Sequence, residues 1–166
     1  MMRKCLIAAK ILALTGLALA GCSPNASEAA PGSTQAAPSV HPVSGLAVVP
    51  LTVTSGDRVH NFRVELARTG QEQARGLMFR TAMGADEGML FPMNPPRGAS
   101  FWMRNTVIPL DLIFVGVDGR ISNIAANAVP YDESPLRSVG LVIAVLELNG
   151  GRAAELGLKP GDKVSW

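Results

Sequence analysis

Only part of this chain has the composition of a folded domain, and this division constrains the fold more than any other feature of the sequence. Residues 1–21 run from a short basic start into an apolar stretch, and residues 22–44 are dominated by Ser, Pro, Ala and Gly. The second segment cannot bury enough apolar surface to offset the entropy of ordering it, so we expect a disordered tether. Residues 45–166 have the length of a single globular domain with one core.

The amino-terminal segment predicts export. Arg3 and Lys4 precede an apolar run from Leu6 to Leu19, which is typical of a signal peptide and is short for a transmembrane helix. The segment ends Leu19-Ala20-Gly21-Cys22, which resembles the bacterial lipobox, where the Cys sulfur carries a diacylglycerol. We interpret residues 1–21 as a lipoprotein signal peptide and Cys22 as the lipidated first residue of the mature chain. The alternative is an ordinary secretory signal with an incidental Cys.

Lipidation of Cys22 would attach the chain to a membrane, because several acyl chains on one residue hold stably to a bilayer. Ser23 follows the Cys in place of the Asp that typically retains lipoproteins in the inner membrane. We therefore expect an exported protein that is lipid-anchored to the bacterial cell envelope, at the outer membrane and facing the periplasm.

Charge and Cys content exclude several classes of function. Three of the 15 Lys and Arg residues lie within residues 1–21, which leaves 12 basic against 13 acidic residues. Without a basic field, no nucleic-acid partner is expected. Cys5 and Cys22 both precede the domain, which therefore has no disulfide and no Cys nucleophile. With His60 as the one His inside the domain, a His-rich zinc site or a Ser-His-Asp triad cannot be built, so no metal and no cofactor is expected.

Short apolar runs separated by turn signals predict a sheet. The runs 46–54 and 59–67 flank the turn Ser55-Gly56-Asp57, which predicts a hairpin. Further strands are expected at 88–93, 99–103, 110–115, 121–127, 141–148 and 163–166.

Two short helices complete the prediction. Thr69 and Glu72 have the spacing of a capping box, which predicts a helix from Gly70 to about Arg75 that Gly76 ends. The second helix is expected over residues 152–156. The predicted fold class is α+β, a small mixed, strongly curved, barrel-like β-sheet with two short helices.

Several short motifs occur in a fixed order along the domain. They are Phe62-Arg-Val-Glu65, Gly76-Leu-Met-Phe-Arg80, Gly88-Met-Leu-Phe91, Phe101-Trp-Met-Arg-Asn-Thr106, Pro109-Leu-Asp111, Phe114, Asp118-Gly119 and Val145-Leu-Glu-Leu148. Together they resemble the bacterial and archaeal family called domain of unknown function 192, from about residue 62 to residue 164. The resemblance implies a compact mixed α/β fold with a curved, barrel-like sheet, often exported or membrane-attached, and implies no established activity.

Asp111 is the acidic residue that most needs an explanation. It stands inside the apolar run 107–115, where an unpaired buried charge would cost several kcal/mol. One hypothesis is that Asp111 and neighbouring polar residues line a small pocket rimmed by Phe101, in which an Arg grips an anionic group and an Asn orients it. The candidate ligand-binding residues are Arg80, Trp102, Asn105, Thr106 and Asp111. The alternative is a buried strut between Asp111 and Arg80 that fixes strand register.

We interpret the chain as a membrane-anchored envelope lipoprotein whose domain binds a small polar ligand or an envelope protein without catalysis, and no catalytic residue is assigned. A first alternative is a carboxylate-dependent hydrolase acting on an envelope substrate, with Asp111 and Glu65 as acid and base. A second is a purely structural envelope protein.

Five Met residues between positions 78 and 103 could hold copper(I), although Met in apolar strings is more simply explained as filling of the core.

Overall fold

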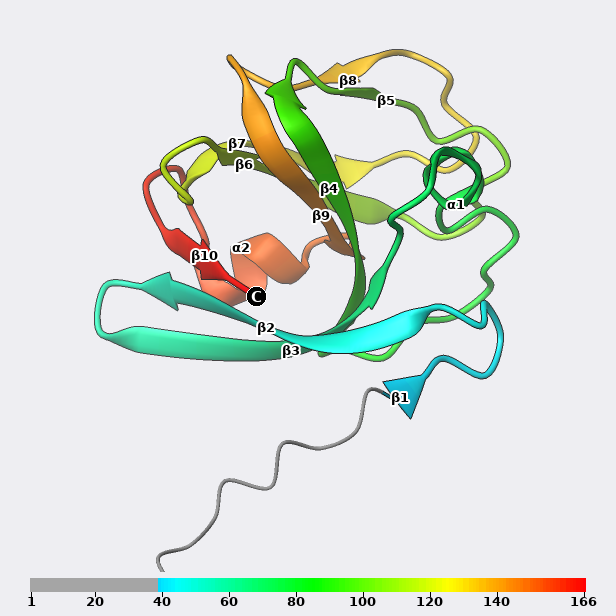
Figure 1. Ribbon diagram of the computed structural model, residues 1–166, viewed down its shortest axis with the longest axis horizontal. Coiled ribbons are helices and arrows are strands. Elements are labelled where there is room, and N and C mark those ends of the chain that lie inside the picture. The colour runs from blue at the N-terminus through cyan, green and yellow to red at the C-terminus, as the bar shows by residue number, and fades with distance from the viewer. Residues whose placement is uncertain (1–38) are drawn as a thin grey trace, which may run out of the picture. The chain divides into compact units, whose positions relative to one another are not determined.

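The computed structural model describes residues 39–166, in which strands greatly outnumber helices (Figure 1). The elements in chain order are β1 (Ser39–Val40), β2 (Ala47–Ser55), β3 (Arg58–Leu66), α1 (Gly70–Arg75), β4 (Glu87–Arg97), β5 (Ser100–Phe101), β6 (Leu110–Gly116), β7 (Ile121–Ala128), β8 (Leu136–Arg137), β9 (Val142–Asn149), α2 (Arg152–Leu156) and β10 (Lys163–Ser165). The predicted signal peptide, Cys22 and most of the predicted tether lie outside the described residues. Within residues 39–166, no helix is long and apolar enough to span a membrane.

Eight strands form one mixed sheet with the order β1-β2-β3-β4-β9-β6-β7, and β10 pairs with β2. The strand β3 runs parallel to β4, whereas the other neighbours are antiparallel. A parallel pair needs a crossover connection, and α1 lies in it. Strands β5 and β8 form a separate two-stranded sheet, drawn above α1 in Figure 1. The α+β class is thus confirmed.

The predicted barrel-like closure is not supported, because the sheet is not closed. The last strand in the sheet order is β7, and the three residues of β10 pair with β2 rather than with β7. Near the start of β7, an isolated bridge between Arg120 and Lys163 and a few backbone hydrogen bonds, such as that from the N–H of Ile121 to the carbonyl of Asp162, reach the residues around β10. One bridge is not a strand ladder, so β7 remains an edge of the sheet.

The sheet buries side chains on both faces. Successive side chains of a strand point to opposite faces. On the face that carries α2, Ile113 of β6 belongs to the same core cluster as Ala153 of α2. On the other face, which we call the α1 face, Phe114 of β6 packs in a second cluster with Phe91 of β4 and with Leu77, just after α1. Burial on both faces explains why β6 is apolar without alternation, and all seven of its residues are buried.

The predicted bounds of the first helix, from Gly70 to Arg75, are confirmed. The N–H of Glu72 donates to Thr69 Oγ1 at 3.2 Å, and the N–H of Thr69 donates to Glu72 Oε2 at 2.8 Å. Gly76 follows the helix with φ 48°, a conformation that favours glycine. This helix buries none of its own residues, so its position depends on side-chain contacts with the sheet.

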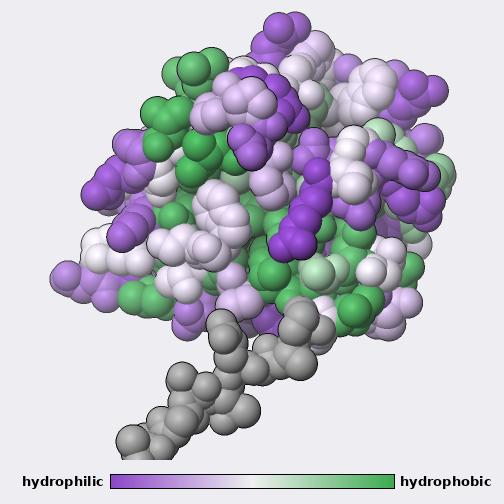
Figure 2. Space-filling view, in the orientation of Figure 1, coloured by the Kyte–Doolittle hydropathy of each residue, from purple (hydrophilic) through white to green (hydrophobic). Residues whose placement is uncertain are grey.

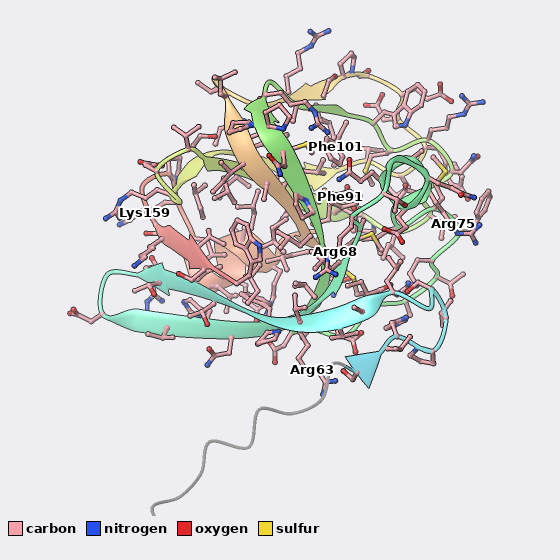
Figure 3. The ribbon with its side chains drawn as sticks, in the orientation of Figure 1. Arg63, Arg68, Arg75, Phe91, Phe101 and Lys159 are labelled. Carbon is pink, nitrogen blue, oxygen red and sulfur yellow. The ribbon has the colours of Figure 1, made fainter. Side chains whose placement is uncertain are left out.

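Strand β1 lies inside the segment predicted to be tether. Ser39 and Val40 pair with the edge of β2, opposite Val48 and Ala47. The Arg63 guanidinium, which Figure 3 shows beside β1, donates to Ser39 Oγ at 2.9 Å. Composition could not reveal this short edge strand, because its partners lie in β2 and β3, farther along the chain.

Candidate functional site

A pocket of about 480 Å³ opens on the α1 face of the sheet. It lies between α1, strand β4, the β5 segment and one side chain of β9. The lining residues that bear on its chemistry are Arg75, Phe91, Arg97, Phe101, Trp102, Thr106 and Glu147. Figure 3 shows Phe91 and Phe101 close together beside α1. The pocket is large enough for a small organic molecule.

Hydrogen bonds and aromatic contacts fix the walls. The Gln73 amide of α1 donates to the carbonyl of Ala67 at 3.1 Å and to that of Pro92 at 2.9 Å, which ties the helix to β4. The Phe101 ring stands edge-on to Phe91, with ring centroids 5.1 Å apart, an arrangement that aromatic pairs prefer. The wall is therefore shaped before any ligand arrives.

Glu147 is the buried acid of this pocket. It lies on β9 between Met89 of β4 and Leu112 of β6, so its carboxyl points to the apolar α1 face. Glu147 is 5% exposed, and among residues 39–166 no group forms a hydrogen bond or an ion pair with its carboxyl. Burial alone raises the pKa of Glu147 from 4.5 to about 8, because an apolar environment disfavours the charged form.

The rim of the pocket carries exposed charged side chains, whereas its walls are apolar. Arg75 and Arg97 are exposed, and Arg97 donates to Gln73 Oε1 at 3.5 Å. Trp102 is 47% exposed, and the Arg104 guanidinium lies 5.4 Å from the centroid of its ring. Figure 2 shows apolar and hydrophilic surface interleaved on the face drawn there. The site thus combines apolar walls, a charged rim and a single carboxyl at depth.

Asp111 is not part of this pocket. Its Oδ1 accepts from the N–H of Asn127 at 2.6 Å and of Gly151 at 3.0 Å, and its Oδ2 accepts from the N–H of Ala153 at 2.7 Å. Gly151 precedes α2 and has no capping side chain of its own, so Asp111 satisfies free N–H groups at the start of that helix. The predicted strut between Asp111 and Arg80 is not formed, because backbone amides take up both carboxylate oxygens of Asp111 and Arg80 lies elsewhere.

Arg80 instead pairs with Glu65. Its guanidinium donates to both carboxylate oxygens, at 2.8 and 3.0 Å, and the side chains are 10% and 4% exposed. The His41 ring covers this pair, with Nε2 3.5 Å from Arg80 Nη1 and Nδ1 3.6 Å from Glu65 Oε2. The N–H of Val43 also donates to His41 Nδ1, at 3.3 Å, which holds the ring beside this pair.

The remaining predicted residues divide between pocket and support. Thr106 and Trp102 line the pocket, whereas Asn105, Arg80 and Asp111 do not. The carbonyl of Asn105 accepts from the N–H of Phe79 at 2.8 Å, and its amide donates to Met78 Sδ at 3.8 Å, so it holds two loops together. The predicted set of five therefore does not form one site, because its members face different partners.

The carboxylates of the hydrolase alternative do not meet. Glu65 pairs with Met89, and Met89 with Glu147, so these three side chains occupy one row on the α1 face. Asp111 is adjacent to Leu112, which also stands in that row, and it therefore points to the opposite face. An acid and a base on opposite faces of a sheet cannot act on one bond.

Sequence reasoning missed Glu147 and His41. Glu147 stands in the apolar run 141–148, the same signal that directed attention to Asp111, and the two could have been weighed together. His41 gave no comparable signal, because its contacts are with Glu65 and Arg80, far along the chain. Within the described part of the chain, no group of three or more His, Cys, Asp or Glu side chains could hold a metal ion.

Comparisons with known proteins give a family and a fold. Residues 51–166 match the family DUF192, described as Uncharacterized ACR. A crystal structure of a protein of unknown function from Novosphingobium aromaticivorans DSM 12444 is 68% identical, with 80% of this chain and 94% of that chain covered and a TM-score of 0.77. A crystal structure from Sinorhizobium meliloti 1021, described as a "putative transcription regulator", is 40% identical in sequence. The match covers 72% of this chain and 94% of that chain, with a TM-score of 0.70. No curated protein matches the chain.

Proposed function

The chain belongs to the uncharacterised family DUF192, as its motifs predicted, and we propose that it is an envelope lipoprotein whose domain binds a small organic ligand without catalysis. The pocket of Glu147 is the proposed binding site.

The observation that carries this proposal is the buried carboxyl itself. The carboxyl oxygens of Glu147 face the cavity rather than the closed interior, because the one fully enclosed side-chain N or O atom without a partner among residues 39–166 is His60 Nε2. A carboxyl that lies in an apolar wall and reaches a cavity is placed to meet a ligand. Asp111 shows how the same domain satisfies a carboxyl that it uses for structure, with three backbone donors. Glu147 has none among the described residues and lines a cavity, which favours a bound ligand as its partner.

The envelope location is supported by the sequence alone, through the segment Leu19-Ala20-Gly21-Cys22. We expect the protein in the outer membrane, facing the periplasm and held by lipid on Cys22. Cys22→Ala should abolish incorporation of labelled palmitate and move the protein out of the membrane fraction, whereas Cys5→Ala should change neither. Membrane association that persists in Cys22→Ala would refute the anchor.

Binding can be tested with three probes that share one aromatic body, namely benzamide, benzoate and benzylamine. We expect at least one of them to shift amide signals of pocket residues in NMR spectra of the purified protein. Ala74 is exposed on α1 and lines the pocket, whereas Gln71 is exposed on the same helix outside it. Ala74→Trp should weaken binding and Gln71→Trp should not. Absence of binding by all three probes, or equal loss in both variants, would overturn the proposed function.

We propose no nucleic-acid partner, although the S. meliloti relative is described as a transcription regulator. After residues 1–21 are removed, the chain has 12 basic and 13 acidic residues, which gives no net positive field.

A further inference from the structure

Building on the ligand-binding function proposed above, we propose that Glu147 recognises its ligand in the protonated form. The pocket then takes an uncharged molecule that places a carboxamide, or a similar pair of adjacent donor and acceptor, against Glu147 and an aromatic or aliphatic body against Phe91 and Phe101.

The surroundings of Glu147 do not support a charge. Its cross-strand neighbours are Met89 and Leu112, and an ionised carboxylate among such side chains would lack any compensating donor. Glu65 stands in the same row beyond Met89, but Arg80 neutralises it. The burial that isolates Glu147 also raises its pKa to about 8, so the protonated form dominates at neutral pH.

The two other charged groups of the pocket lie at its rim. Arg75 comes from α1 and Arg97 from the end of β4, and both are exposed to solvent. Burial is the physical cause of the raised pKa of Glu147. Two guanidinium groups at the mouth disfavour a cationic ligand, while solvent screening limits what they can add for an anion.

A protonated carboxyl offers one O–H donor beside one carbonyl acceptor. A carboxamide presents the complementary pair, an N–H beside a C=O, so the two groups can form two parallel hydrogen bonds. A carboxylic acid kept neutral by an apolar site is an effective donor for this reason. The rings of Phe91 and Phe101, set edge-on, give the ligand body an apolar surface on which to pack.

The three probes distinguish this inference from the general binding function. At about pH 6.5 we expect benzamide to bind about fivefold or more tightly than benzoate and benzylamine, since only benzamide matches the donor and acceptor of a neutral carboxyl. Raising the pH to about 9 should weaken benzamide binding by about tenfold, because each pH unit above the pKa lowers the protonated fraction tenfold.

Two variants at position 147 sharpen the test. Glu147→Gln keeps a donor and an acceptor but cannot ionise, so it should bind benzamide within about threefold of the wild type and lose the dependence on pH. Glu147→Leu should lose most of the affinity. Glu155→Gln changes an exposed acid on α2 and serves as the control, with wild-type binding and wild-type pH dependence.

The outcomes separate the two proposals. Tightest binding of benzylamine, accompanied by loss of binding in Glu147→Gln, would show an ionised Glu147 and overturn this inference while leaving the binding function intact. Tightest binding of benzoate would do the same and would assign recognition to the arginines. Failure of all three probes would overturn both proposals.

Discussion

Asp111→Asn tests whether the buried acid of β6 is structural. In the wild type, Asp111 accepts three backbone N–H groups, from Asn127, Gly151 and Ala153, at 2.6–3.0 Å. The substitution keeps the shape of the side chain but removes the charge, and it turns an amide nitrogen toward at least one of these donors. The expected effect is therefore on stability rather than on ligand binding.

The magnitude follows from those three bonds. A hydrogen bond to a charged group contributes about 1.5–3 kcal/mol, and an amide leaves one donor unsatisfied and the others weakened. We expect Asp111→Asn to lower the free energy of unfolding by about 3–4 kcal/mol, a large share of the roughly 5–15 kcal/mol of a typical domain. For a domain of this size the melting temperature should fall by roughly 12–15 °C.

Urea unfolding followed by circular dichroism measures this loss, and hydrogen exchange locates it. The amides of Asn127 in β7 and of Gly151 and Ala153 at the start of α2 should lose protection before the central strands of the sheet. Glu155→Gln, which removes the ion pair between the exposed Glu155 carboxylate and Arg152 on the same helix, should cost less than about 1 kcal/mol. A change of less than about 1 kcal/mol in Asp111→Asn, or loss of benzamide binding at unchanged stability, would refute the structural role.

Two further predictions concern the buried acids Glu147 and Glu65. Glu147 has a folded-state pKa of about 8 against an ordinary 4.5, so between these pH values the folded protein holds a proton that the unfolded chain has lost. Stability should therefore fall by about 1.4 kcal/mol per pH unit over that window and level off above it. Glu147→Gln should remove this contribution, and parallel pH profiles of unfolding for wild type and variant would contradict it. Arg80→Met leaves Glu65 buried without its partner and should lower the free energy of unfolding by about 3–5 kcal/mol. The double variant Glu65→Gln/Arg80→Met should recover part of this loss. Strictly additive losses in thermal unfolding would argue against the pair.

Local signals in the sequence were sufficient for much of the fold. The capping box of Thr69 and Glu72 predicted α1, and the turn Ser55-Gly56-Asp57 predicted the hairpin of β2 and β3. Both signals act between residues a few positions apart, so they do not depend on the rest of the chain. The family resemblance also followed from short motifs and is confirmed by the match over residues 51–166.

The pairing of strands that are distant in sequence was not predicted correctly. The run 99–103 contributes a strand of only two residues, and the loop after β7 contributes its equally short partner β8. The barrel expected from the number of strands is not formed, because closure depends on whether β7 and β10 meet along a ladder. No residue pattern within either strand specifies that contact.

The sequence by itself determined that a carboxyl in an apolar strand must have a physical reason, and it identified Asp111 on this ground. Only the tertiary structure decided what that reason is. Asp111 points to the α2 face and meets the amide of Ala153, 42 positions along the chain, whereas Glu147 points to the α1 face and meets a cavity. A shift of one residue in a strand moves a side chain to the other face of the sheet. Partners distant in sequence then determine whether a buried acid stabilises the fold or remains free to bind a ligand.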